Sequence, residues 1–173
     1  MKLLKNQAVA WVLTIVMIVA AIGISYARAP KAPHPEPPNA PAASDSYVWD
    51  DAGVLSSSTR RTLNERNSRL LREYDTIIGV ITCEYGGDDL YSYAWEQAEQ
   101  MGLGSYDMLV ALDIMGDNYY LLTGNGLTRD FTDWDSADYL DRYMEKPFAK
   151  GDYDRAVLDL TEMLEAWYGT YYG

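Results

Sequence analysis

The chain has 173 residues, 48% of them hydrophobic, and a formal net charge of −12 at pH 7. The charge is uneven, because residues 45–173 contain 10 basic and 25 acidic residues and therefore carry −15. A segment this acidic repels the phosphates of nucleic acids and of anionic lipids, which excludes nucleic acid as a partner and favours cations or basic partners.

The sequence contains one cysteine, Cys83, and one histidine, His34. A single cysteine excludes a disulfide within the chain. Because His34 lies in a proline-rich stretch, the predicted domain has no histidine, which excludes Ser-His-Asp and Cys-His catalytic arrangements and disfavours zinc. Any chemistry must come from carboxylates, hydroxyls and backbone groups, with calcium or magnesium as the candidate ion. The chain lacks a Gly-Lys-Ser/Thr loop, which excludes nucleotide binding by a P-loop. No organic cofactor is expected.

Two segments precede the predicted domain. Residues 8–27 carry no charged side chain and are long enough to span a bilayer as a helix, which takes about 20 residues. We therefore expect residues 1–27 to be a transmembrane signal anchor, with a cleaved signal peptide as the alternative. Residues 28–46 hold six of the seven prolines and predict an extended linker. The short leading tail favours a single-pass protein of the cell membrane whose domain, residues 47–173, lies outside the cytoplasm.

Hydrophobic periodicity and turn residues predict the elements of this domain. In chain order they are a helix after the serines at 56–58, a buried strand at 76–83, a helix at 90–101, a second buried strand at 107–114, a tight turn at 115–118, a third strand at 119–124, a helix at 132–144 and a final helix from 153 to 167.

The order of these elements predicts the fold class. A helix between two strands makes the first two strands parallel, and the tight turn makes the third antiparallel. We therefore expect an α/β fold, a three-layer α/β/α sandwich around a small mixed sheet, preceded by one N-terminal transmembrane helix. Within it, Gly116 should supply the dihedral freedom of the tight turn, and Pro147 should close the preceding helix.

A set of oxygen-bearing side chains forms a candidate ion site. The predicted hairpin should bring the Gly124-Asn125-Gly126 turn close to Asp107, and further aspartates follow in the chain. Hard cations prefer six to eight such oxygen ligands. The glycine turn itself could instead bind an anion through its backbone amides, or serve only as a turn.

Asp50 and Asp51 are open to two interpretations. They could form a turn and a cap before the first helix, or they could contribute to the ion site if the opening strand lies at the same edge. The sequence does not decide between these. The candidate metal ligands are Asp50, Asp51, Asp107, Asn125, Asp130 and Asp133, and no catalytic residue can be assigned.

Four stretches, in this order, resemble the TPM domain family. They are "VWDDAGVLS" (48–56), "MGLGSYDMLVAL" (101–112), "YYLLTGNGL" (119–127) and "KPFAKGDYDRAV" (146–157). The chain departs from the family pattern at two loops, with Asp107-Met108-Leu109 where Asp-Asn-Gly is common and Asn125 where the family has tyrosine. The resemblance implies an α/β sandwich that is often tethered to a membrane outside the cytoplasm. It also implies links to acid phosphatase activity in some members, calcium binding in others, and assembly or repair of membrane complexes in several.

Two functional hypotheses follow. In the first, the domain is a non-catalytic interaction or assembly module for membrane proteins, with or without bound calcium. In the second, it is a metal-assisted acid phosphatase, a phosphomonoesterase in which Asp107 and Asp50 or Asp51 hold the cation. The tether, the altered loops, the absence of a histidine general acid and the charge of −15 favour the first.

Overall fold

A four-stranded sheet forms the centre of the computed structural model, which describes residues 47–173. Its strands are β1 (Val48–Asp50), β2 (Ile78–Cys83), β3 (Met108–Asp113) and β4 (Asn118–Thr123), in that spatial order. β1, β2 and β3 are parallel, and β4 is antiparallel to β3. The prediction of an α/β fold with a mixed sheet is therefore confirmed.

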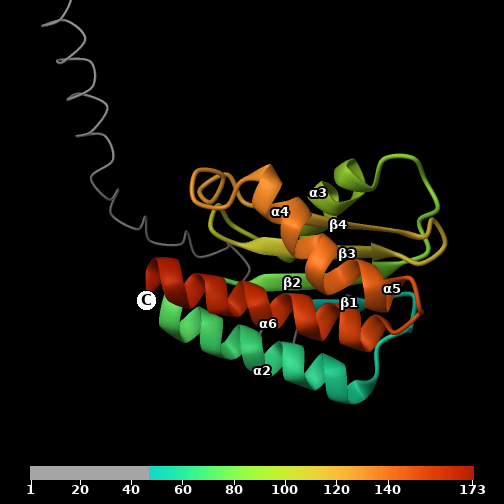
Figure 1. Ribbon diagram of the computed structural model, residues 1–173, viewed down its shortest axis with the longest axis horizontal. Coiled ribbons are helices and arrows are strands. Elements are labelled where there is room, and N and C mark those ends of the chain that lie inside the picture. Colours follow the sequence, from blue (N-terminus) through green and yellow to red (C-terminus); the bar gives the residue numbers. More distant parts are fainter. Residues whose placement is uncertain (1–46) are drawn as a thin grey trace, which may run out of the picture. The chain divides into compact units, whose positions relative to one another are not determined.

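Helices cover both faces of the sheet (Figure 1). They are α2 (Ser57–Tyr74), α3 (Leu90–Met101), α4 (Asp133–Tyr139), the π-helix η2 (Leu140–Glu145), α5 (Lys146–Phe148) and α6 (Tyr153–Tyr172). α2, α6, η2 and α5 pack on one face, and α3 packs on the other. The expected anchor at 1–27 and linker at 28–46 lie outside the described residues. Within residues 47–173, no helix is both long and apolar enough to cross a membrane.

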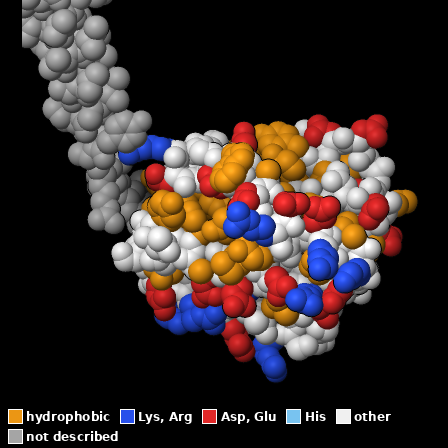
Figure 2. All heavy atoms as spheres, viewed as in Figure 1, with side chains coloured by type: hydrophobic (Ala, Val, Ile, Leu, Met, Phe, Trp, Pro, Cys, Tyr) orange, Lys and Arg blue, Asp and Glu red, His pale blue; other side chains and the backbone are white. Residues whose placement is uncertain are grey.

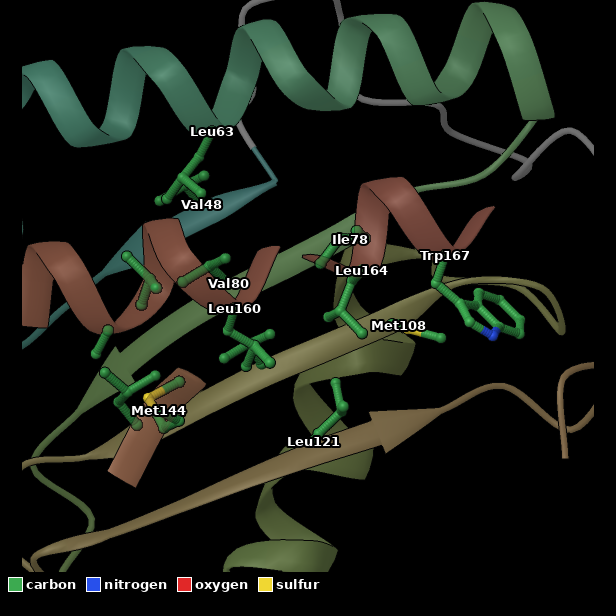
Figure 3. Packing of buried hydrophobic residues seen from close by; sticks show 14 of the residues in the cluster. Val48, Leu63, Ile78, Val80, Met108, Leu121, Met144, Leu160, Leu164 and Trp167 are labelled. Carbon is green, nitrogen blue, oxygen red and sulfur yellow. The ribbon is translucent and has the colours of Figure 1, made fainter. Parts of the chain in front are cut away.

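The alternating side chains of the strands fill two cores of unequal size. Val110 and Leu112 point into the larger core, which α2 and α6 close, whereas Leu109 and Ala111 point into the smaller core beneath α3. Figure 3 shows the larger core, with side chains from the strands and from α2, η2 and α6 packed together. Burying each large aliphatic side chain here contributes roughly 1.5–3 kcal/mol, so this core dominates the stability of the fold.

α2 and α6 lie side by side, and polar groups at their interface are paired (Figure 1). Ser56 caps α2, its hydroxyl accepting from the Thr59 amide at 3.2 Å. Arg66 of α2 is almost fully buried, and its Nε donates to Glu165 of α6 at 2.9 Å. The backbone carbonyl of Leu158 accepts a further hydrogen bond from the same guanidinium at 3.1 Å. The polar atoms of this buried arginine are thus matched across the helix pair.

Two local predictions need correction. Gly116 does not adopt a left-handed conformation; Asp117 does, with φ of 46°. Gly116 is needed for space instead, because a Cβ there would lie 2.3 Å from the carboxylate of Asp113. Pro147 does not close a helix either. It stands in the first turn of α5, directly after η2, and the flanking residues Glu145, Lys146 and Ala149 are all right-handed helical.

Candidate functional site

The predicted metal ligands divide between the two ends of the sheet. Asp50 ends β1 and is aligned with Thr82, near the end of β2. Asp107 precedes β3, at the start of the parallel strands, where the Gly124 amide donates to its carbonyl at 2.9 Å. Asp50 is aligned through Thr82 with Leu112, five residues after Asp107. At about 3.3 Å per residue, Asp50 and Asp107 are therefore about 16 Å apart along the strands. The structure does not bring Asp50 and Asp107 together, because the parallel pairing of β1 with β2 places Asp50 at the opposite end of the sheet.

Asp50 holds the turn that leads into α2. Its Oδ1 accepts from the Val54 amide at 3.0 Å and from the Thr82 hydroxyl at 2.7 Å. Its Oδ2 accepts from the Leu55 amide at 3.2 Å and from the Arg60 guanidinium at 2.7 Å. The carboxylate is only 3% exposed. The turn interpretation thus applies to Asp50, whereas the side chain of Asp51 is exposed.

Asp107 is a second buried carboxylate with several donors. It accepts from the amides of Ile77 at 2.8 Å and Gly104 at 2.6 Å, and from the Thr76 hydroxyl at 3.2 Å. Asp107 is 2% exposed. It therefore ties the start of β2 to the loop before β3, and its oxygens are directed at the protein's own donors.

The other three predicted ligands are exposed. Asp133 begins α4. Asp130 lies near the end of α6, where burial and the charge of Asp130 raise the pKa of Tyr172 to about 12. Within residues 47–173, no three Asp, Glu, Cys or His side chains come close enough together to hold a metal ion.

The Gly124-Asn125-Gly126 turn is explained by close packing. A Cβ on Gly124 would lie 2.4 Å from the Ser105 carbonyl oxygen, and one on Gly126 would lie 2.8 Å from it. The amide of Gly126 donates to that same oxygen at 2.8 Å. Since the amides of both glycines already bond the chain, this segment is a glycine turn that lets two loops approach closely.

Cys83 is a core residue. It is 4% exposed, and its thiol donates to the Leu112 carbonyl at 3.5 Å. Burial raises the pKa of the Cys83 thiol. A buried thiol that resists ionisation is a poor nucleophile.

Two adjoining depressions follow β4, and we call them together the β4 groove. The first, of about 250 Å³, lies between α3 and the loops that flank β3 and β4. The second, of about 220 Å³, lies between β4 and the start of α4. Both are lined by Trp95, Leu122, Thr123 and Asn125. Of the predicted ligands, Asp107 lines the first depression and Asp133 the second, with Asn125 in both.

Aromatic rings form one wall of the β4 groove. Tyr91 meets Tyr120 edge to face, with ring centroids 5.6 Å apart, and lies 6.4 Å from Trp95. Tyr91 and Trp95 are 48% and 38% exposed. The Trp95 indole donates to the Glu99 carboxylate at 3.1 Å, which places a negative charge beside the ring. Burial, then the neighbouring Tyr91 and Asp133, raise the pKa of Tyr120, so its hydroxyl stays neutral at physiological pH.

Acidic residues outnumber basic ones around this groove, although the exposed Arg129 directly follows Thr128, which lines it. No lysine or arginine occurs in residues 73–128, which contain ten acidic residues and form β2, α3, β3 and β4. In Figure 2, Lys and Arg side chains lie mostly over the α2, α5 and α6 side, with a further basic side chain at the upper left next to the grey atoms, and acidic and hydrophobic side chains lie at the upper right rim. The charged side chains that line the two depressions are therefore acidic.

The sequence-based reasoning missed this groove, although signals were present. The apolar positions of α3 predict its buried side, and Tyr91, Trp95 and Glu99 fall outside them at spacings of four residues. The stretch without basic residues was a second signal.

Comparison with known proteins identifies a family. The family model described as TPM domain matches residues 48–167. The UPF0603 protein Rv2345 of Mycobacterium tuberculosis is 29% identical over 115 residues, which cover 65% of this chain. The chain spans only 17% of the length of that relative.

Solved structures show the same fold at low sequence identity. The N-terminal domain of a protein from P. gingivalis has a TM-score of 0.68 and 22% identity, covering 80% of this chain and 94% of that one. The N-terminal domain of the cg2496 protein from Corynebacterium glutamicum has a TM-score of 0.58 and 19% identity, covering 73% and 82%. The BA42 protein from Bizionia argentinensis has a TM-score of 0.55 and 13% identity, covering 68% and 83%.

Proposed function

The chain belongs to the TPM domain family, and from that premise we propose that residues 47–173 are a non-catalytic interaction module for membrane proteins. The N-terminal segment anchors the module in the cell membrane, and the proline-rich linker holds it outside the cytoplasm. The module binds a partner protein through its surface and does not turn over a substrate. No ion is required at the strand-end aspartates.

The observation that carries this proposal is the use of Asp50 and Asp107. A metal-assisted phosphatase needs carboxylates that bind the cation together and face the substrate. These two residues lie at opposite ends of the sheet, are almost fully buried, and accept hydrogen bonds from backbone amides of the chain. Their geometry supports structural roles.

The phosphatase hypothesis is tested by turnover. The full chain, held in a non-ionic detergent, is assayed for hydrolysis of p-nitrophenyl phosphate between pH 4 and pH 8, with calcium, magnesium or EDTA. We expect no hydrolysis above the buffer rate under any condition. Ion-dependent turnover that Asp51→Asn or Asp130→Asn removes would contradict the proposal, because both side chains are exposed and neither substitution should disturb the fold.

The interaction role is tested in membranes. A photo-reactive amino acid placed on the exposed surface of α3, for example at Glu96, should give a discrete cross-linked product with a membrane protein. The same probe on α6, at Glu162, is the matched control and should give none. Equal products from both positions would contradict a specific docking face.

A further inference from the structure

We propose that the β4 groove binds an extended, lysine- or arginine-rich segment of a partner polypeptide, which joins the sheet as an additional strand beside β4. This inference rests on the proposed interaction function and specifies the chemistry of its partner. Three observations carry it: the edge position of β4, the shape of the groove, and its charge and aromatic lining.

The outer edge of β4 directs backbone groups toward the groove. β4 is the last strand of the sheet. The amide of Met108 donates to the Ile77 carbonyl, so even-numbered residues of β3 bond β2 and odd-numbered ones bond β4. Leu109 is aligned with Leu122. It follows that Leu122 bonds β3, whereas the amides and carbonyls of Leu121 and Thr123 point away from it. These are the groups that an added strand uses.

The groove follows this edge over several residues. The second depression is lined by Tyr120, Leu121, Leu122 and Thr123 in succession. Successive strand residues point to opposite faces of a sheet. A depression that touches four of them in a row therefore runs along the strand edge, which suits an extended chain.

The lining determines the charge of the partner. Glu99 and Asp133 line the groove, and no lysine or arginine lines either depression, although the exposed Arg129 follows Thr128 at one end. The exposed rings of Tyr91 and Trp95 can hold a cationic side chain over their faces. A basic segment is therefore favoured, and an acidic one is repelled.

The same features disfavour two other occupants. The chain's own residues 28–46 hold six prolines, which lack the N–H groups that strand addition requires. A second copy of the domain would bring another strongly acidic β4 surface to the first. Charge repulsion opposes that pairing.

The test uses fluorescein-labelled eight-residue peptides and the full chain in a non-ionic detergent. The probe alternates lysine and valine. A lysine-proline peptide has the same charge but cannot pair as a strand, and a glutamate-valine peptide can pair but has the opposite charge. By fluorescence anisotropy we expect the lysine-valine peptide to bind. The lysine-proline peptide should bind at least about tenfold more weakly, and the glutamate-valine peptide should not bind.

Variants locate the binding. Trp95→Ala should weaken binding of the lysine-valine peptide about tenfold, as for an aromatic anchor at an interface. Glu99→Gln should weaken it severalfold and reduce its salt dependence. Trp134→Ala and Glu162→Gln are matched controls, because Trp134 is exposed outside the groove and Glu162 lies on α6. Both should stay within about twofold.

Several results would overturn the inference. Equal binding of the lysine-proline peptide, or full competition by spermine at matched charge, would mean that charge alone is recognised. Equal effects of the groove and control variants would place binding elsewhere. If no peptide binds while the α3 cross-link persists, the groove inference fails and the interaction module stands. If phosphate ester turnover appears and the cross-link does not, the proposed function itself fails.

Discussion

The layer of α2 and α6 and the layer of α3 cover opposite faces of one sheet, but their charged side chains are used differently. On the α2 side, Arg60, Arg66 and Arg69 each meet an acidic partner. On the α3 side, the sequence supplies acids and aromatic residues without a lysine or arginine. The first face stabilises the fold through its charges, and the second presents charge and rings to solvent. Stability and recognition are thus separated by the sheet.

The largest expected effect is a difference in stability between a substitution in the larger core and one in the smaller core. Leu160→Ala on α6 should lower the free energy of unfolding by about 4 kcal/mol, because Leu160 is fully buried in the larger core. Leu90→Ala on α3 should cost only about 2 kcal/mol, since the smaller core borders the groove and can relax. Urea unfolding of the full chain in detergent measures both. A larger loss for Leu90→Ala would contradict the assignment of stability to the α2–α6 side.

Asp107→Ala should lower the free energy of unfolding by about 3 kcal/mol. The substitution leaves the buried Ile77 amide and the Gly104 amide without their acceptor. The loss should be the same in calcium and in EDTA. Asp133→Ala, at an exposed residue of the same groove, should change stability by less than about 0.5 kcal/mol. A loss that appears only with calcium would show that Asp107 is an ion ligand.

Arg66→Ala should cost about 2 kcal/mol. The substitution leaves the Leu158 carbonyl and the partly exposed Glu165 carboxylate without their shared donor. Glu99→Gln, on the opposite face, should cost less than about 0.5 kcal/mol because its charge is exposed. Thermal unfolding of both variants gives the comparison. Similar losses would mean that the two faces do not differ as described.

The smallest effect depends on pH. Burial alone raises the pKa of Asp154, but hydrogen bonds from Ser56 and Thr59 and the charge of Arg60 lower it below its ordinary value. A lowered pKa in the folded state adds stability above the ordinary value of about 3.9, and this is lost as the pH falls through the folded pKa. Asp154→Asn should therefore cost about 1 kcal/mol at pH 7 and less at pH 2. Denaturant unfolding at both pH values measures it, with Asp51→Asn as the control, and a pH-independent loss would contradict it.

Local patterns were enough to predict much of the fold. β2 and β3 are continuous apolar runs, as expected for strands buried on both faces, and the turn after β3 returns the chain as β4. The position of β1 could not be predicted, because its pairing with β2 is a long-range contact of three residues. That one pairing decides that Asp50 lies far from Asp107. The π-helix η2 could not be predicted either, because apolar residues at helical spacing do not distinguish a π-helix from an α-helix.

The candidate site was predictable only in part. The approach of Gly124 to Asp107 followed from the hairpin. The burial of the Asp107 carboxylate could not be predicted. One donor, the Ile77 amide, is far from Asp107 in the sequence, and the other, the Gly104 amide, belongs to an irregular loop. The aromatic wall of the groove was accessible to sequence reasoning through the spacing of Tyr91 and Trp95. That this aromatic wall borders the edge of the sheet could be recognised only once the position of β4 was known.

The most direct test of a docking face along β4 is amide hydrogen exchange, followed by NMR, on the full chain with and without the lysine-valine peptide. Strand addition engages the amides of Leu121 and Thr123, so their exchange should slow severalfold or more as the peptide saturates. The amides of Leu122 and of α6 should not change, because they already bond within the fold. Binding without protection of Leu121 and Thr123, or with protection confined to the α2–α6 face, would contradict the account.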